Sequence, residues 1–123
     1  MQTSMYSKEL VGASVRPILL TILSKEESYG YEIIQKVKGY SLGKLVWKDG
    51  SLYPVLHKME DEGVIESFWS ETDSGRRRKY YRISALGKSQ LEVEKSQWID
   101  VNALLMRLWG IQPGPAVVSG GRS

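Results

Sequence analysis

The sequence has no cysteine, and its 123 residues include one histidine, His57. The absence of cysteine excludes disulfide bonds, thiolate catalysis and cysteine-based zinc sites. No apolar run approaches the roughly 20 residues needed to span a bilayer, and residues 1–7 do not have the layout of a signal peptide. We therefore expect a soluble, cytoplasmic protein with one domain and an appended element, since the chain is too short for two ordinary domains.

Groups that would carry catalysis or bind a metal are also missing. His57 has no Ser, Cys or second His placed to form a recognisable triad or metal site, and there is no glycine-rich phosphate loop. Glu60, Asp61 and Glu62 are consecutive, so on a helix they splay apart and do not converge on one ion. We expect no enzyme activity, no metal and no cofactor.

The positive charges are unevenly distributed, although the net charge is only +3. Five lysines between residues 36 and 58 are accompanied by one acid, Asp49, and residues 76–79 are an unbroken run of Arg-Arg-Arg-Lys. Local clustering of this kind predicts a polyanionic partner.

Hydrophobic periodicity predicts two helices before residue 40, over residues 8–26 and 29–38. Pro17 either kinks the first helix or starts another one. Ser28 is the expected N-cap of the second helix.

A third helix is predicted from its expected cap, Ser51, to Gly63, with Pro54 in its first turn. Its apolar stripe comprises Leu52, Val55, Leu56 and Met59. A helix of this width enters the major groove of DNA. The residues that would then reach bases and phosphates are Ser51, Tyr53, Pro54, His57 and Lys58, with Lys48 ahead of the helix. The alternative is an ordinary solvated helix face.

Residues 64–70 and 79–84 are rich in β-branched and aromatic residues and predict a hairpin with a loop over residues 71–78. The cations of this hairpin would grip the DNA backbone or enter a minor groove. They are Arg76, Arg77, Arg78, Lys79 and the neighbouring Arg82. A plain charged loop is the alternative.

A last helix is predicted over residues 85–109, and its seam requires a partner helix. Trp98 on this seam either stacks on a planar ligand or packs across a dimer interface. We expect the Gly- and Pro-rich residues 110–123 to be disordered. The seam comprises Leu91, Glu94, Trp98, Val101, Leu105 and Leu108.

Four motifs in this order resemble the PadR family of bacterial transcriptional regulators: Tyr29–Ile33, Ser51–Leu56, Met59-Glu60 with Gly63–Ile65, and Gly75–Ser84 followed by Gly87. The resemblance covers about residues 15–108. It implies an α+β, mostly α fold, with a winged helix-turn-helix domain (residues 1–84) and a C-terminal dimerisation helix (residues 85–109). It also implies a homodimer on a pseudo-palindromic operator in double-stranded DNA.

Family members typically repress genes for detoxification, efflux or aromatic-acid metabolism and are released by a small ligand. Trp98 matches a tryptophan that lines the dimer pore in some relatives, so a planar hydrophobic effector would bind there with Val101 and Asn102. The first helix would join the interface, which comprises Leu10, Leu91, Trp98, Val101, Leu105 and Leu108. Pro17 and the tail lie outside the family pattern. Two alternatives stay open: a protein-interaction module, and a small-molecule-binding module without specific DNA binding.

Overall fold

The computed structural model describes residues 3–4 and 6–112 of the chain. Most of the tail that the sequence predicts to be disordered, residues 113–123, therefore lies outside the described residues. The elements in chain order are β1 (Thr3–Ser4), α1 (Lys8–Lys25), β2 (Ser28–Tyr29), α2 (Gly30–Tyr40), β3 (Leu45–Val46), α3 (Asp49–Asp61), β4 (Ile65–Glu71), β5 (Arg77–Ile83) and α4 (Ala85–Trp109).

The chain divides into two compact units, with the boundary between Glu92 and Val93. This boundary lies inside α4, whereas the sequence predicted that the winged domain ends at residue 84. The start of α4 belongs to the first unit because Gly87 and Leu91 are buried in it.

The core of the first unit is apolar and is built mainly from one face of each of the first three helices, with residues from the strands and from the start of α4 added to it. Pro17 lies inside α1, which is a single helix and not two. The predicted stripe of α3 is confirmed, since Leu52, Leu56 and Met59 are buried and Val55 packs against them. Each such aliphatic side chain stabilises the fold by about 1.5–3 kcal/mol when fully buried.

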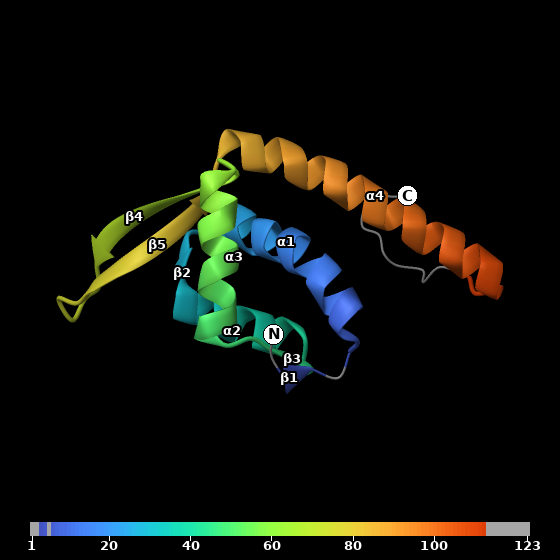
Figure 1. Cartoon of the computed structure of the whole chain (residues 1–123), viewed down its shortest axis with the longest axis horizontal. Helices are drawn as coiled ribbons and strands as arrows, with labels where there is room; N and C mark the ends of the chain where they lie inside the picture. Colours follow the sequence, from blue (N-terminus) through green and yellow to red (C-terminus); the bar gives the residue numbers. More distant parts are fainter. Residues whose placement is uncertain (1–2, 5, 113–123) are drawn as a thin grey trace. The chain divides into compact units, whose positions relative to one another are not determined.

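A three-stranded antiparallel sheet in the order β2-β5-β4 forms the wing. The hairpin of β4 and β5 projects beyond α3 in Figure 1. In its register Phe68 faces Tyr80 and Glu71 faces Arg77. The predicted loop was too long, because the ladder continues to Arg77 and leaves residues 72–76 as the turn. Arg77 and Arg78 therefore have the alternating directions of strand residues.

Both predicted serine caps are wrong. Ser28 is a fully buried residue of β2, and its hydroxyl accepts a hydrogen bond from Lys36 Nζ at 2.6 Å. The N-cap of α2 is Tyr29, whose backbone N–H donates to Glu32 Oε1 at 3.3 Å.

Helix α3 begins at Asp49, with Lys48 as its N-cap, so Ser51 is helical and Pro54 lies beyond the first turn. A proline there removes the N–H that would bond the Gly50 carbonyl. Gly50 and Pro54 are both exposed, so water can solvate that carbonyl.

Gly63 ends α3, as predicted, with a positive φ of 81°. The N–H of Gly63 donates to Glu60 O at 2.9 Å, and that of Val64 donates to Met59 O at 3.2 Å. This is a Schellman motif.

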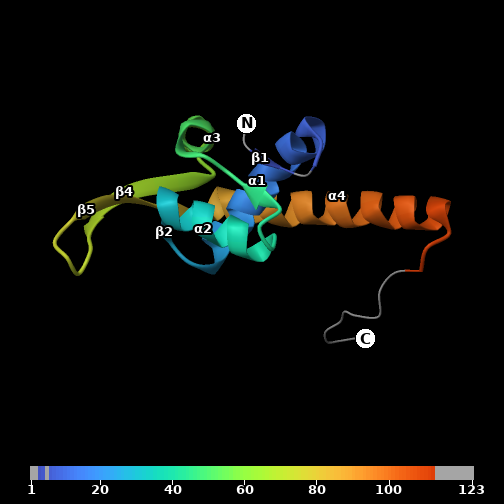
Figure 2. The ribbon, with the colours of Figure 1, turned by 90° about the horizontal axis from the view of Figure 1, so that it is seen from below.

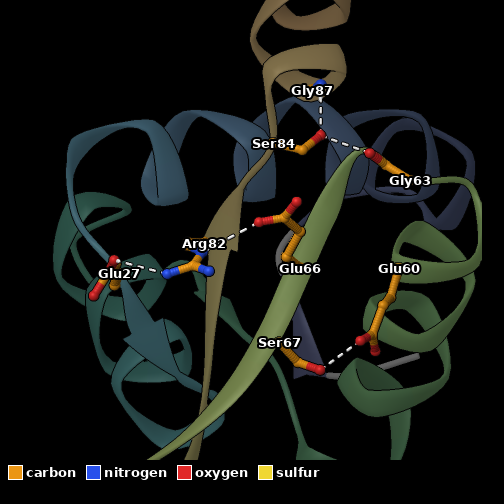
Figure 3. A network of polar contacts seen from close by, with 8 residues as sticks. All are labelled: Glu27, Glu60, Gly63, Glu66, Ser67, Arg82, Ser84 and Gly87. Carbon is orange, nitrogen blue, oxygen red and sulfur yellow. Dashed lines mark hydrogen bonds and ion pairs between the residues drawn. The ribbon is translucent and has the colours of Figure 1, made fainter.

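Close contacts fasten the start of α4 to the end of α3. The Ser84 hydroxyl donates to Gly63 O at 2.6 Å and accepts from the Gly87 N–H at 3.0 Å (Figure 3). A Cβ on Gly87 would lie 2.0 Å from Val64 O, so no larger residue fits there unless the backbone moves. These contacts hold α3, the hairpin and the start of α4 in one unit.

Strands β1 and β3 pair in a second, two-stranded sheet. The sequence did not predict it, because strands of two residues have no measurable periodicity. Beside β3, Trp47 is 1% exposed, so the segment between the second and third helices, for which the sequence predicted no helix or strand, contributes a large core residue.

Candidate nucleic-acid interface

The outward face of α3 carries the polar side chains that the sequence predicted for it. Tyr53, Pro54, His57 and Lys58 are exposed, and Ser51 is half-buried. Lys48 is exposed at the N-cap. The apolar stripe on the opposite side of α3 packs into the core. The polar face is therefore exposed to solvent on a helix that the core holds in place.

Tyr53 is positioned by a glycine of the neighbouring helix. A Cβ on Gly30, the first residue of α2, would lie 2.4 Å from the Tyr53 hydroxyl oxygen. Only a residue without a side chain allows the phenol to lie at the N-terminus of α2. This contact joins α2 and α3 at the surface.

The wing has two faces because side chains alternate along its strands. One face, here called the inner face, carries Ser67, Trp69, Arg77, Lys79 and Tyr81. The Ser67 hydroxyl donates to Glu60 of α3, which shows that this face meets α3 (Figure 3). Figure 2 shows α3 nearly end-on beside the base of the hairpin. The other face, here called the outer face, carries Glu66, Phe68, Arg78, Tyr80 and Arg82.

The outer face is an aromatic cluster with cations on its rings. Tyr80 contacts Tyr29 edge-on at 5.3 Å between ring centroids and stacks on Phe68 at 5.7 Å. Arg78 Cζ lies 4.4 Å from the Tyr29 ring centroid, and Arg82 Cζ lies 4.8 Å from that of Phe68. These distances are typical of cation–π contacts.

Arg82 is further neutralised by acids. Its Nε lies 3.2 Å from Glu66 Oε1, and its Nη1 lies 3.9 Å from Glu27 Oε2 (Figure 3). Its charge is therefore largely compensated within the fold.

The inner face carries positive charge without such compensation. Arg77 Cζ lies 5.0 Å from the Trp69 ring centroid, and Lys79 Nζ lies 5.8 Å from that of Tyr81. Within the described residues, no carboxylate is at ion-pair distance from Arg77 or Lys79, although Glu71 faces Arg77 in the register. These two cations are available to an external anion.

A cavity of about 650 Å³ lies between α3, the N-terminus of α2 and the inner face of the wing. We call it the cleft. Its lining has cationic and aromatic residues and no acidic one, which favours anionic ligands. The lining residues are Tyr29, Gly30, Tyr31, Tyr53, Pro54, His57, Trp69, Arg77, Arg78, Lys79 and Tyr81.

Two groups close to α3 have shifted pKa values. Burial, with smaller effects from Tyr53 and Glu60, raises the pKa of the Tyr81 phenol. At the end of α3, the hydrogen bond from Arg16 lowers the pKa of the Glu62 carboxyl, and Arg16 Nη2 also donates to Gln90 of α4 at 2.7 Å. At neutral pH the Tyr81 phenol therefore stays neutral in its buried position, and the Glu62 carboxyl stays ionised beside Arg16.

Six of the eleven residues predicted to contact DNA line the cleft: Tyr53, Pro54, His57, Arg77, Arg78 and Lys79. The other five do not, namely Lys48, Ser51, Lys58, Arg76 and Arg82. The sequence indicated no binding role for Tyr31 or Trp69, and it placed Tyr29 only at the start of the second predicted helix. The unusual triplet Tyr29-Gly30-Tyr31 at a helix start was the available signal, since a glycine there permits close approach of another side chain.

In the second unit, α4 carries exposed apolar side chains along the predicted seam. Trp98 is 40% exposed, Val101 54% and Leu108 71%, while Asn102 is exposed and Leu105 is half-buried. Leu91, predicted with this interface, is instead 6% exposed in the core of the first unit. It packs against the chain's own residues and has little surface for a partner. Leu10 of α1 is 51% exposed.

Two further observations concern other kinds of site. Among residues 3–4 and 6–112, no three His, Cys, Asp or Glu side chains are grouped so as to hold a metal ion. No helix in that part of the chain has the length and apolarity required to cross a membrane.

Comparison with known proteins gives consistent relatives. The model of the "Transcriptional regulator PadR-like family" matches residues 19–93. A Lysinibacillus sphaericus protein named "Uncharacterized protein X" is 30% identical over 101 residues, which are 82% of this chain and 93% of that protein. The Mycobacterium tuberculosis protein "Transcriptional regulator Rv3488" is 30% identical over 90 residues, 72% of this chain and 78% of its own.

Solved structures share the fold. A PadR-like transcriptional regulator from Bacillus cereus has a TM-score of 0.76 and 31% identity, and the match covers 85% of this chain and all of the other. A PadR family transcription regulator from Clostridium difficile has a TM-score of 0.68 and 32% identity, with 78% and 97% coverage. The predicted fold class, a winged helix with a C-terminal helix, is confirmed.

Proposed function

The chain belongs to the PadR-like family of transcriptional regulators, and on this premise we propose that it is a sequence-specific, homodimeric, ligand-releasable repressor of the cytoplasm. The observation that carries the proposal is the cleft, where an exposed helix face and uncompensated wing cations lie side by side. The regulated genes would be those for detoxification, efflux or aromatic compounds, as the family resemblance implies.

The geometry of B-DNA explains how the cleft is used. If α3 enters a major groove and the wing enters the adjacent minor groove, the backbone strand between the grooves must pass along the cleft. Arg77 and Lys79 then face its phosphates, and the Tyr53 hydroxyl donates to a phosphate oxygen. His57 and Lys58, further along α3, reach base edges and the neighbouring backbone.

A second copy of the chain would cover the exposed stripe of α4. Trp98, Val101, Leu105 and Leu108 recur at spacings of three and four residues, which is the pattern of a helix seam. Two-fold pairing places two recognition helices on successive major grooves, so the operator would be pseudo-palindromic.

The effector would bind at this helix, beside Trp98, Val101 and Asn102. A ligand releases DNA only if it binds better to the dimer whose recognition helices are wrongly spaced. The hydrogen bonds of Ser84 and the close packing of Gly87 against Val64 fix the start of α4 to the end of α3. A movement of α4 would therefore be transmitted to α3.

The first test is fluorescence anisotropy with labelled DNA from upstream of the protein's own gene, at several salt concentrations and against a scrambled duplex. Preferential binding that weakens steeply with salt supports the proposal. Equal, weak binding to both duplexes, and to duplexes from neighbouring promoters, would favour a protein-interaction or ligand-binding module.

The dimer is tested by sedimentation of Leu108→Glu beside the original chain. A charge on the stripe should shift a dimer to monomer, because an unpaired buried charge is strongly destabilising in an interface. As a matched control, Lys88→Glu changes an exposed residue at the start of α4 and should leave the dimer intact. A monomeric original chain would contradict the dimer.

A further inference from the structure

Three aromatic rings of the cleft offer more stacking surface than a duplex uses. In the proposed complex a backbone strand passes the cleft, while the bases remain stacked within the duplex. Tyr31 is 59% exposed, Trp69 57% and Tyr53 45%, and all three line the cavity. The faces of such rings stack readily on another planar ring. The cleft therefore presents a ring-binding surface that the proposed DNA complex leaves uncovered.

The same cavity selects for negative charge. Arg77 and Lys79 have no acidic partner among the described residues, and the lining contains no carboxylate. The Nε of Arg78 is buried and has no hydrogen-bond partner among the described residues. A phosphate accepts hydrogen bonds from guanidinium and ammonium groups with good geometry. Ring stacking and anion binding are thus offered within one space.

The volume suits a small molecule. At about 650 Å³, the cleft falls within the roughly 300–1,000 Å³ of typical ligand pockets. Its walls come from α3, the N-terminus of α2 and strands β4 and β5 of the wing, so their backbones are held by the core and need no ordering upon binding.

We infer that the cleft binds a free mononucleotide, with the base between Trp69 and the tyrosine rings and the phosphate on Arg77 and Lys79. Binding of the nucleotide does not require that the protein binds an operator. The effect of the nucleotide on DNA binding, however, rests on the proposed function. The nucleotide and the DNA backbone require the same cations, so they exclude each other and the nucleotide weakens DNA binding. This site is separate from the effector site proposed on α4.

The test is nuclear magnetic resonance of the full chain titrated with adenosine monophosphate. The sequence has four tryptophans, and their indole N–H signals are assigned by Trp→Phe variants. Adenosine monophosphate should shift the Trp69 signal and the Gly30 amide in a saturable manner, while Trp98 and Trp109 stay in place. No saturable shift at millimolar nucleotide, or a shift centred on Trp98, would overturn the inference.

Two comparison ligands separate the parts of the site. Adenosine lacks the phosphate and inorganic phosphate lacks the ring, so each should bind at least about tenfold more weakly than the nucleotide, a difference of about 1.4 kcal/mol. If either binds as tightly as the nucleotide, the combined site does not exist.

Charge-matched variants locate the anion. Arg77→Ala with Lys79→Ala should weaken nucleotide binding about tenfold or more, or about 1.4 kcal/mol. Lys25→Ala with Lys88→Ala removes two exposed charges outside the cleft and should leave the affinity unchanged. Equal losses in both variants would show general electrostatic attraction and overturn the site.

Competition with DNA is measured last and separately. The apparent Kd for an operator should rise with the factor 1 + [nucleotide]/Kd of the nucleotide. A saturable Trp69 shift without any effect on DNA affinity would overturn the exclusion. Failure to bind any duplex would defeat the proposed function alone, because the Trp69 titration still reports the nucleotide site.

Discussion

The inner and outer faces of the wing use the same residue types for different purposes. On the outer face, Arg78 and Arg82 lie on aromatic rings, and Arg82 also contacts Glu66 and Glu27. On the inner face, Arg77 and Lys79 also lie on rings but have no acidic partner among the described residues. The cations of the wing are therefore not equivalent: the charge of Arg82 is compensated and stabilises the wing, whereas Arg77, Lys79 and the cleft-lining Arg78 have no acidic partner among the described residues.

The largest expected effect separates the faces by DNA affinity. Arg77→Ala with Lys79→Ala should weaken operator binding about a hundredfold, since each charged hydrogen bond contributes about 1.5–3 kcal/mol. The slope of log affinity against log salt should fall by about 0.9 for each phosphate that the protein no longer neutralises. Arg82→Ala removes a cation whose charge Glu66 and Glu27 already compensate, and it should change the affinity less than about threefold. Equal losses in the two variants, measured by anisotropy, would contradict the comparison.

The next effect concerns stability, for which the outer face should matter more than the inner face. Tyr80→Leu breaks the ring contacts with Tyr29 and Phe68 and should lower the free energy of unfolding by about 1–2 kcal/mol. Trp69→Leu, on the exposed inner face, should change it by less than about 0.5 kcal/mol while weakening DNA binding indirectly, because Arg77 lies on the Trp69 ring. Urea denaturation and anisotropy of both variants measure the two quantities. A larger stability loss in Trp69→Leu would refute the division of roles.

A smaller effect is expected from the glycine that positions Tyr53. Gly30→Ala should displace the phenol, because the new Cβ meets its oxygen at 2.4 Å, and should weaken DNA binding about fivefold, or roughly 1 kcal/mol. Gly39→Ala in the same helix meets nothing within 4 Å. It should leave DNA affinity unchanged and stabilise the helix by about 0.5–1 kcal/mol. If both variants bind DNA normally, Tyr53 needs no such support.

The smallest effect is a dependence of stability on alkaline pH. The pKa of Tyr81 is raised in the folded state, mainly by burial, so above its unfolded value of about 10 the unfolded chain binds fewer protons than the folded one. Stability should therefore fall as pH rises through that range, by less than about 1.4 kcal/mol per unit. Denaturation at several pH values checks this, and Tyr81→Phe should reduce the fall.

Much of the fold could be predicted from residue spacing. The apolar stripe of α3, the stop at Gly63, the hairpin and the extent of α4 follow from periodicity and turn chemistry, which act over a few neighbouring residues. The N-caps of α2 and α3 could not be predicted, because Ser28 and Ser51 are both plausible N-caps when only their neighbours in sequence are considered. Ser28 is drawn into the sheet by its pairing with Tyr81, a residue far along the chain.

Residue types and their local spacing by themselves determined that this chain folds as a winged helix with a basic hairpin and an apolar C-terminal helix. The tertiary structure alone decided which cation of the wing is compensated, because contacts between distant segments bring Glu27 and Glu66 to Arg82 and place Arg77 on Trp69 and Arg78 on Tyr29. It also decided that Leu91 belongs to the core and that Tyr31 and Trp69 share a cavity. These outcomes depend on contacts between distant segments, whose energies no local pattern contains.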